Sequence, residues 1–192
     1  MFVDWFVGDG MYETVEEIVV RPMQRFHLAN VGRMIKAVGP NLKRFEIALI
    51  AMQMQGGFDD VFATSFSLEP CVNLTSLTFG SPGGYSVLYH TDDKSCRWIE
   101  IMLSQITSKV ISEISFWVDE EDVVKIRTGK WDGIISLLLS KKFGSLKKVE
   151  LKLREDNKMV MDAVESFMKR RLNKLHVDGV LVFVRNWRPP DI

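Results

Sequence analysis

A six-residue apolar phrase recurs six times along the chain and constrains its fold more than any other feature. It consists of an apolar residue, two variable positions, a second apolar residue, one variable position and a third apolar residue. Successive copies start 27, 32, 37, 35 and 26 residues apart, a spacing typical of one supersecondary unit repeated to build a solenoid. The copies are Val15/Ile18/Val20, Leu42/Phe45/Ile47, Leu74/Leu77/Phe79, Ile111/Ile114/Phe116, Leu146/Val149/Leu151 and Leu172/Leu175/Val177.

The phrases and the segments between them have different apolar periods. Alternate residues are apolar in 114–116 and 149–153, which is typical of strands with one covered face. Strands joined by helical crossovers run parallel, with right-handed connections. The sequence therefore predicts an α/β fold, a single solenoid with a curved parallel sheet inside and helices on the outer face. Helical spacing of apolar residues predicts these helices over 31–38, 61–66, 98–106, 131–139 and 160–168.

The length and composition favour one domain. Of the 192 residues, 46% are hydrophobic, which is enough apolar material for one core. We expect a single repeat domain over 1–192, with an N-terminal end segment at 1–14, about six strand–helix repeats at 15–185 and a tail at 186–192. Residues 1–96 hold 7 Lys and Arg against 11 Asp and Glu, and the remainder holds 18 against 14, so the charge should form a dipole along the chain.

The segment from Trp131 to Leu151 carries a resemblance to a known family. It reads as Trp131, an apolar helix, and then Phe143, Leu146, Val149 and Leu151 at fixed spacing. With its relatives along the chain, this unit resembles the leucine-rich repeat, in the irregular αβ form found downstream of an F-box in fungal F-box-like proteins. The resemblance implies a leucine-rich-repeat-like solenoid that binds a protein partner.

Two departures from that family are visible. The regular repeat has Asn or Cys after the strand, whereas the corresponding positions here hold Met23, Ile50, Pro82, Asp119, Arg154 and Val180. No F-box precedes the first phrase, so we expect that ubiquitin-ligase recruitment is not encoded in this chain.

The cysteines and the first residues indicate a compartment. Cys71 and Cys96 are the two cysteines, and a domain with an adequate core does not need a disulfide, so we expect both thiols to be reduced. Residues 1–10 lack the basic and apolar regions of a secretory signal. No apolar run approaches the roughly 18 residues that a membrane-spanning helix needs. A cytoplasmic or nuclear protein without a membrane partner is expected.

Patterns that carry chemistry are weak in this sequence. His27, His90 and His176 stand far apart, and neither cysteine has the spacing of a zinc site, so we expect no metal and no other cofactor. The G-x-S-x-G motif of hydrolases does not occur, and we assign no catalytic residue. Most paired carboxylates adjoin strand ends or helix starts, where capping explains them. The run 119–122 is the exception, because it lies in a long loop and could recognise a basic partner.

The basic stretch 141–174 holds 11 Lys and Arg against 5 Asp and Glu. Nucleic acid would require these charges on one face, but solenoid geometry distributes them, so a solvated face is favoured. An intracellular small-ligand or nucleic-acid binder, using the long loops after the strands and this basic half, is the alternative function.

The remaining surface is the inner face of the sheet. Because side chains alternate along a strand, the neighbours of the core residues point to this face. Trp117 stands out there, since a large aromatic side chain can anchor a protein interface, although packing beneath the following loop would use it equally well. We expect a non-enzymatic protein-interaction module whose partner binds the inner sheet face or the long loops. Its candidate partner-binding residues are Glu17, Glu46, Thr78, Ser115, Trp117, Glu150, Lys152 and His176.

Overall fold

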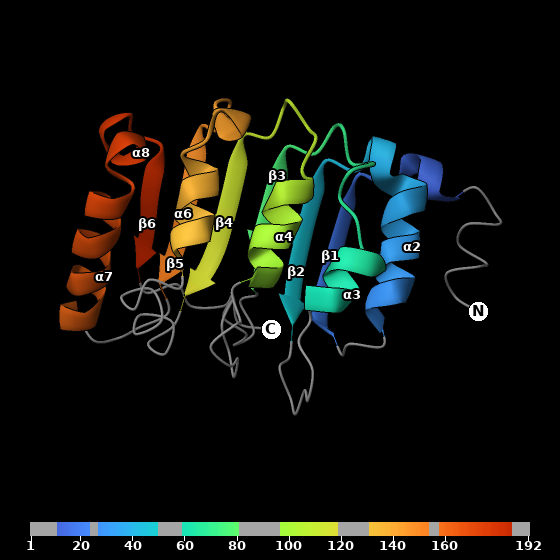
Figure 1. Ribbon diagram of the computed structural model, residues 1–192, viewed down its shortest axis with the longest axis horizontal. Helices are drawn as coiled ribbons and strands as arrows, with labels where there is room; N and C mark the ends of the chain where they lie inside the picture. The colour runs from blue at the N-terminus through green and yellow to red at the C-terminus, as the bar shows by residue number, and fades with distance from the viewer. Residues whose placement is uncertain are drawn as a thin grey trace.

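Six parallel strands form the frame of the protein. The computed structural model describes residues 11–23, 27–49, 59–80, 97–118, 131–153 and 158–185. Every neighbouring pair of strands is parallel, and strands that follow each other in sequence lie side by side (Figure 1). The prediction of an α/β fold with a parallel sheet is therefore confirmed. The strands are β1 (Glu17–Met23), β2 (Arg44–Leu49), β3 (Ser76–Phe79), β4 (Glu113–Val118), β5 (Lys148–Leu153) and β6 (Leu181–Arg185).

The described helices lie on one face of this sheet, in front of the strands in Figure 1. Each of the five helices predicted from apolar spacing is present, with boundaries shifted by up to three residues at the start and up to three at the end. Short 3-10 turns extend some of the connections. The helices are α2 (Leu28–Val38), α3 (Asp59–Thr64), α4 (Arg97–Gln105), α6 (Asp132–Leu138), α7 (Lys158–Arg171) and α8 (Asn173–Val177), with 3-10 turns η1 (Met11–Thr14), η3 (Gly39–Asn41) and η4 (Lys141–Phe143).

The core lies between the helices and the sheet. In-register pairing places the second apolar residue of each of the first five phrases in one row across the sheet and the third in the next row, and β6 continues both rows. Aromatic rings continue this core into the helices: Phe79 stacks on Phe116 at 5.3 Å between centroids, and Phe116 meets Trp131 at 5.1 Å. The two rows are Ile18, Phe45, Leu77, Ile114, Val149 and Leu181, followed by Val20, Ile47, Phe79, Phe116, Leu151 and Phe183.

The first apolar residue of a phrase fixes each return from helix to strand. Leu42, Leu74 and Ile111 are fully buried at these returns. The backbone ladder begins beside them. The backbone N–H of Lys43 donates to the carbonyl of Glu16 at 2.8 Å, and equivalent backbone bonds join the later returns. The returns are thereby held together at one edge of the sheet, which we call the return edge. It comprises residues 39–43, 65–75, 106–112, 139–147 and 172–180.

The sixth phrase is wrong as a strand prediction. Leu172 precedes α8 and Leu175 lies within it, and the strand follows later as β6. An apolar pair at i and i+3 fits a helix as well as the phrase, and both leucines are buried in the helical arrangement. Gly179, with φ of 71°, then turns the chain into β6. The continuous run of β-branched and aromatic residues Val182-Phe183-Val184 was the better strand signal.

Candidate functional site

The candidate site is the face of the sheet that no described helix covers, and we call it the helix-free face. Register places its side chains in rows that cross the strands. The first row is Glu17, Arg44, Ser76, Glu113 and Lys148, the second is Val19, Glu46, Thr78, Ser115 and Glu150, and the third includes Trp117 and Lys152.

Ion pairs between β1 and β2 neutralise one end of this face. Two guanidinium nitrogens of Arg44 donate to one carboxylate oxygen of Glu17, at 2.7 and 3.2 Å. Beside them, the Lys43 ammonium donates to Glu16 at 2.5 Å. Hydrogen bonding raises the pKa of Arg44 and lowers the pKa of Glu16. The part of the face around Glu17 is therefore a set of balanced pairs.

A buried carboxylate organises the β4–β5 part of the face. The Glu150 side chain is 7% exposed and lies 2.7 Å from the Lys148 ammonium and 3.2 Å from the Lys152 ammonium. Ser115 donates its hydroxyl hydrogen to the same carboxylate at 3.0 Å. Burial raises the pKa of Glu150, but the two lysines and Ser115 outweigh burial and hold the pKa below its ordinary value. Lys148 also bonds Glu113 at 3.0 Å, which makes a chain of alternating charges.

Trp117 is buried, so it does not offer the exposed aromatic anchor that was one of the two uses considered for it. Only 3% of this residue is exposed, and the Lys152 ammonium lies 5.0 Å from the ring centroid. Strand alternation correctly placed Trp117 opposite the helix-covered core, but alternation does not report what else covers a ring. The alternative packing role for Trp117 fits its burial.

The other expected residues separate into accessible and inaccessible groups. Glu17 is exposed and Glu46 and Thr78 are half-buried, whereas Ser115 and Glu150 are buried. His176 lies on α8, away from the helix-free face, because the sixth phrase is helical. Sequence reasoning missed Arg44 and Glu113, although both stand directly before a core residue and alternation could have found them.

Several predicted features lie outside the described residues. These are His90, Cys96, the run 119–122 and the long loops after β3 and β4. Cys71 is a free, buried cysteine, and burial raises the pKa of its thiol to about 12. The described residues contain no group of three or more His, Cys, Asp or Glu side chains arranged to hold a metal ion.

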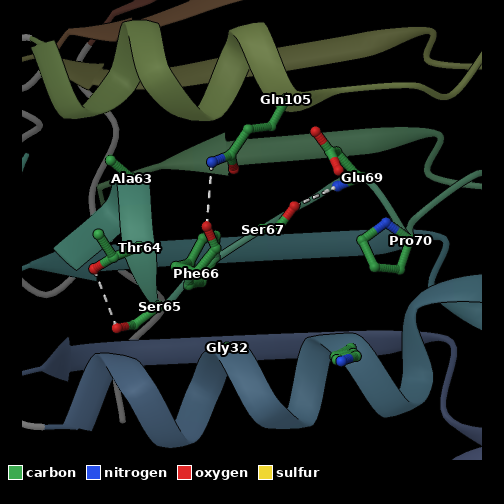
Figure 2. A pocket seen from close by; sticks show the side chains of 10 residues that line it. Gly32, Ala63, Thr64, Ser65, Phe66, Ser67, Glu69, Pro70 and Gln105 are labelled. Carbon is green, nitrogen blue, oxygen red and sulfur yellow. Dashed lines mark hydrogen bonds between the residues drawn. The ribbon is translucent and has the colours of Figure 1, made fainter. Parts of the chain in front are cut away.

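A polar pocket of about 460 Å³ lies on the helix side of the sheet (Figure 2). Gly32 and Lys36 of α2, residues 63–67 with Glu69 and Pro70, and Gln105 of α4 line it. The Gln105 amide donates to the carbonyls of Phe62 and Phe66 at 3.2 and 3.1 Å and accepts from the Leu68 N–H at 3.2 Å. Because these bonds use both ends of the amide, Gln105 braces the chain that leaves α3.

The fold and the helix-free face define an α/β protein with a six-stranded parallel sheet and a charge-paired polar face. No protein-family model, no curated protein and no solved structure matches the chain. Within the part of the chain that the structure describes, no helix has both the length and the apolar character needed to cross a bilayer.

Proposed function

We propose that the chain is a non-enzymatic protein-interaction module, built as a leucine-rich-repeat-like solenoid and acting in the cytoplasm or nucleus. The sequential parallel strand order and the in-register apolar rows support the solenoid. The free Cys71 thiol is compatible with a reducing compartment.

The observation that carries this proposal is an accessible strip on β1, β2 and β3 of the helix-free face. Val19 is 44% exposed in the middle of β1, in the same row as Glu46 and next to the polar row that holds Glu17 and Arg44. The Glu17–Arg44 pair lies in the adjacent row, and the half-buried Glu46 on β2 separates Val19 from the partly exposed Thr78 on β3. An apolar centre with a polar surround is the composition that protein interfaces favour.

The same strip argues against a small ligand or a catalytic role there. Glu17 and Arg44, with Glu16 and Lys43 beside them, are already paired, so they offer a fixed pattern of charge to a large complementary surface. Such pairs set the register of a partner, while the affinity comes from buried apolar contacts. Val19 therefore takes over the anchoring role that the sequence suggested for Trp117.

Site-specific photo-crosslinking in extracts of the native cell tests the proposal. A photoreactive residue at Thr78 should crosslink a defined protein, and one at the exposed helix position Ser136 should not. Val19→Asp should abolish the Thr78 crosslink, while Val72→Asp, at a similarly exposed valine off this face, should preserve it. Identical crosslinks from both positions, or none from Thr78, would contradict the proposal.

A further inference from the structure

The return edge carries a second surface with its own composition. The returns into β3, β4, β5 and β6 lie along the upper edge of the molecule in Figure 1. Adjacent strands are about 4.8 Å apart, so successive returns form a row at about that interval.

Lysines are concentrated in the last three of these returns. Within 106–112, 139–147 and 172–180 there are five lysines and one carboxylate, Asp178. Lys142 is anchored by the hydrogen bond that its ammonium donates to the carbonyl of Ser104. Partial burial also lowers the pKa of this ammonium. In the described part of the chain, no ion pair is formed by the four others, which are the exposed residues Lys109, Lys141, Lys147 and Lys174.

Exposed apolar side chains lie among these lysines. Among the described residues, five large apolar side chains are strongly exposed, and three of them are on the return edge. Val72 and Val110 are each 51% exposed, and Val177 is 74% exposed. Val110 directly follows Lys109, and Val177 lies three residues after Lys174, so two of the three returns combine an exposed valine with an exposed lysine.

We propose that this edge docks an acidic polypeptide segment that also carries apolar side chains. Carboxylates of the segment would lie against Lys109, Lys147 and Lys174, and its apolar side chains would cover Val110 and Val177. Three stacked returns span about 10 Å, and alternate side chains of an extended peptide are about 6.8 Å apart, so a stretch of about four or five residues covers the row. The surface is separate from the strip on β1 to β3.

A peptide fits this surface better than a nucleic acid does. The cations are lysines, which act as point charges. Arginines, by contrast, form bidentate hydrogen bonds to phosphates and stack on bases. The strongly exposed apolar residues in the described chain are valines and one methionine, with no aromatic ring on which a base could stack. Glu69, in the return into β3, would repel a phosphate backbone that continued along the edge.

Binding of a labelled peptide, measured by fluorescence anisotropy with the full chain, tests the proposal. The probe is a peptide of about eight residues in which Asp and Glu alternate with Leu, compared with the same peptide carrying Asn and Gln. The triple variant Lys109→Glu, Lys147→Glu and Lys174→Glu should weaken binding of the acidic probe at least about tenfold. The matched charge control is Lys36→Glu, Arg97→Glu and Lys158→Glu, which are exposed positions elsewhere and should change binding less than about twofold.

Three further measurements distinguish the proposed acidic peptide from other possible occupants of this surface. Val110→Ser with Val177→Ser should also weaken the acidic probe, and the amide peptide should bind weakly to every variant. Equal weakening by both charge triples, or no binding of the acidic probe, would overturn the proposal.

Tighter binding of an oligothymidine of about twenty nucleotides would assign the edge to nucleic acid instead. Self-association of the chain that only the lysine triple abolishes would assign it to a second copy. Each of these failures leaves the Thr78 crosslink unaffected, so the two proposals are tested separately.

Discussion

The Glu150 carboxylate lies 2.7 Å from the Lys148 ammonium, although only 7% of the Glu150 side chain is exposed. Replacing the carboxylate by an amide removes the countercharge of two lysines in a partly desolvated place. We expect Glu150→Gln to lower the free energy of unfolding by about 1.5–3 kcal/mol at pH 7, measured by urea denaturation. Glu17→Gln, on an exposed pair, is the matched control and should cost less than about 1 kcal/mol.

The same carboxylate should give the protein an acid-sensitive component of stability. The pKa of Glu150 in the folded protein lies below its ordinary value of 4.5, so its stabilising contribution is complete above that pH. This contribution to stability is lost as the pH falls from 4.5 through the lowered pKa of Glu150 in the folded state. The difference in unfolding free energy between wild type and Glu150→Gln should therefore shrink on acidification. A difference that stays constant with pH would contradict this assignment.

Leu151→Ala tests the register of the sheet. Leu151 is fully buried on β5, between Phe116 of β4 and Phe183 of β6. The cavity left by its side chain should cost about 2–5 kcal/mol. Lys147→Ala, an exposed change just before the same strand, should leave the melting temperature nearly unchanged. Equal melting temperatures for Leu151→Ala and wild type would refute the register.

Trp117→Ala should destabilise the protein rather than act on binding alone. Its ring is buried and lies beside the Lys152 ammonium, so truncation should cost about 3–5 kcal/mol. Trp117→Phe keeps an aromatic ring in place and should cost less. Thermal unfolding of both variants measures this, and a wild-type melting curve for Trp117→Ala would return the residue to the exposed surface.

Gly32→Ala should destabilise α2 even though alanine is the better helix former. A methyl group at this position would lie 2.0 Å from the carbonyl oxygen of Ser65. Moving α2 away from the α3 return should cost about 1–3 kcal/mol, more than the roughly 1 kcal/mol that helix propensity contributes. Asn30→Ala, exposed on the same helix, should be neutral or stabilising. The comparison of the two unfolding free energies is the measurement.

Cys71 should resist alkylation until the protein unfolds. Burial raises the pKa of its thiol from 9.0 to about 12, so little thiolate exists in the folded state at pH 8. In a Cys96→Ser background, iodoacetamide should label Cys71 slowly in the native protein and rapidly in urea. Since the folded pKa is raised, the contribution of this thiol to stability is complete below pH 9.0 and is lost as the pH rises toward 12. Equal labelling rates in both states would contradict the buried placement.

The sequence alone predicted the strands where two apolar periods agreed. At Leu146, Val149 and Leu151, a buried entry residue is followed by alternation, and both signals indicate the same strand. At Leu172 and Leu175 only the three-residue spacing is present, and a helix satisfies it equally well. The later apolar run that contains Val182 and Val184, rich in β-branched residues, was the signal for the sixth strand.

The site was less predictable because its character depends on pairs of residues far apart in the chain. Glu17 and Arg44 are 27 positions apart, and their contact depends on the register between β1 and β2. The burial of Trp117 likewise depends on neighbours from other segments, which periodicity within one strand cannot report. Alternation within one strand predicts the face of the sheet on which a side chain lies. Its accessibility and the balance of charge around it can be predicted only when the pairing of the strands is known.

The order of the strands has a consequence for how this protein can change in length. Each strand from β2 to β5 bonds the strand before it and the strand after it in sequence, so the described sheet contains no late strand inserted between earlier ones. A duplicated unit placed between β3 and β4 would meet the same kind of edge on both sides and would leave the earlier hydrogen bonds intact. Evolution, or a designer, could therefore add or remove whole units by tandem duplication and deletion, while the return edge and the helix-free face lengthen or shorten in step.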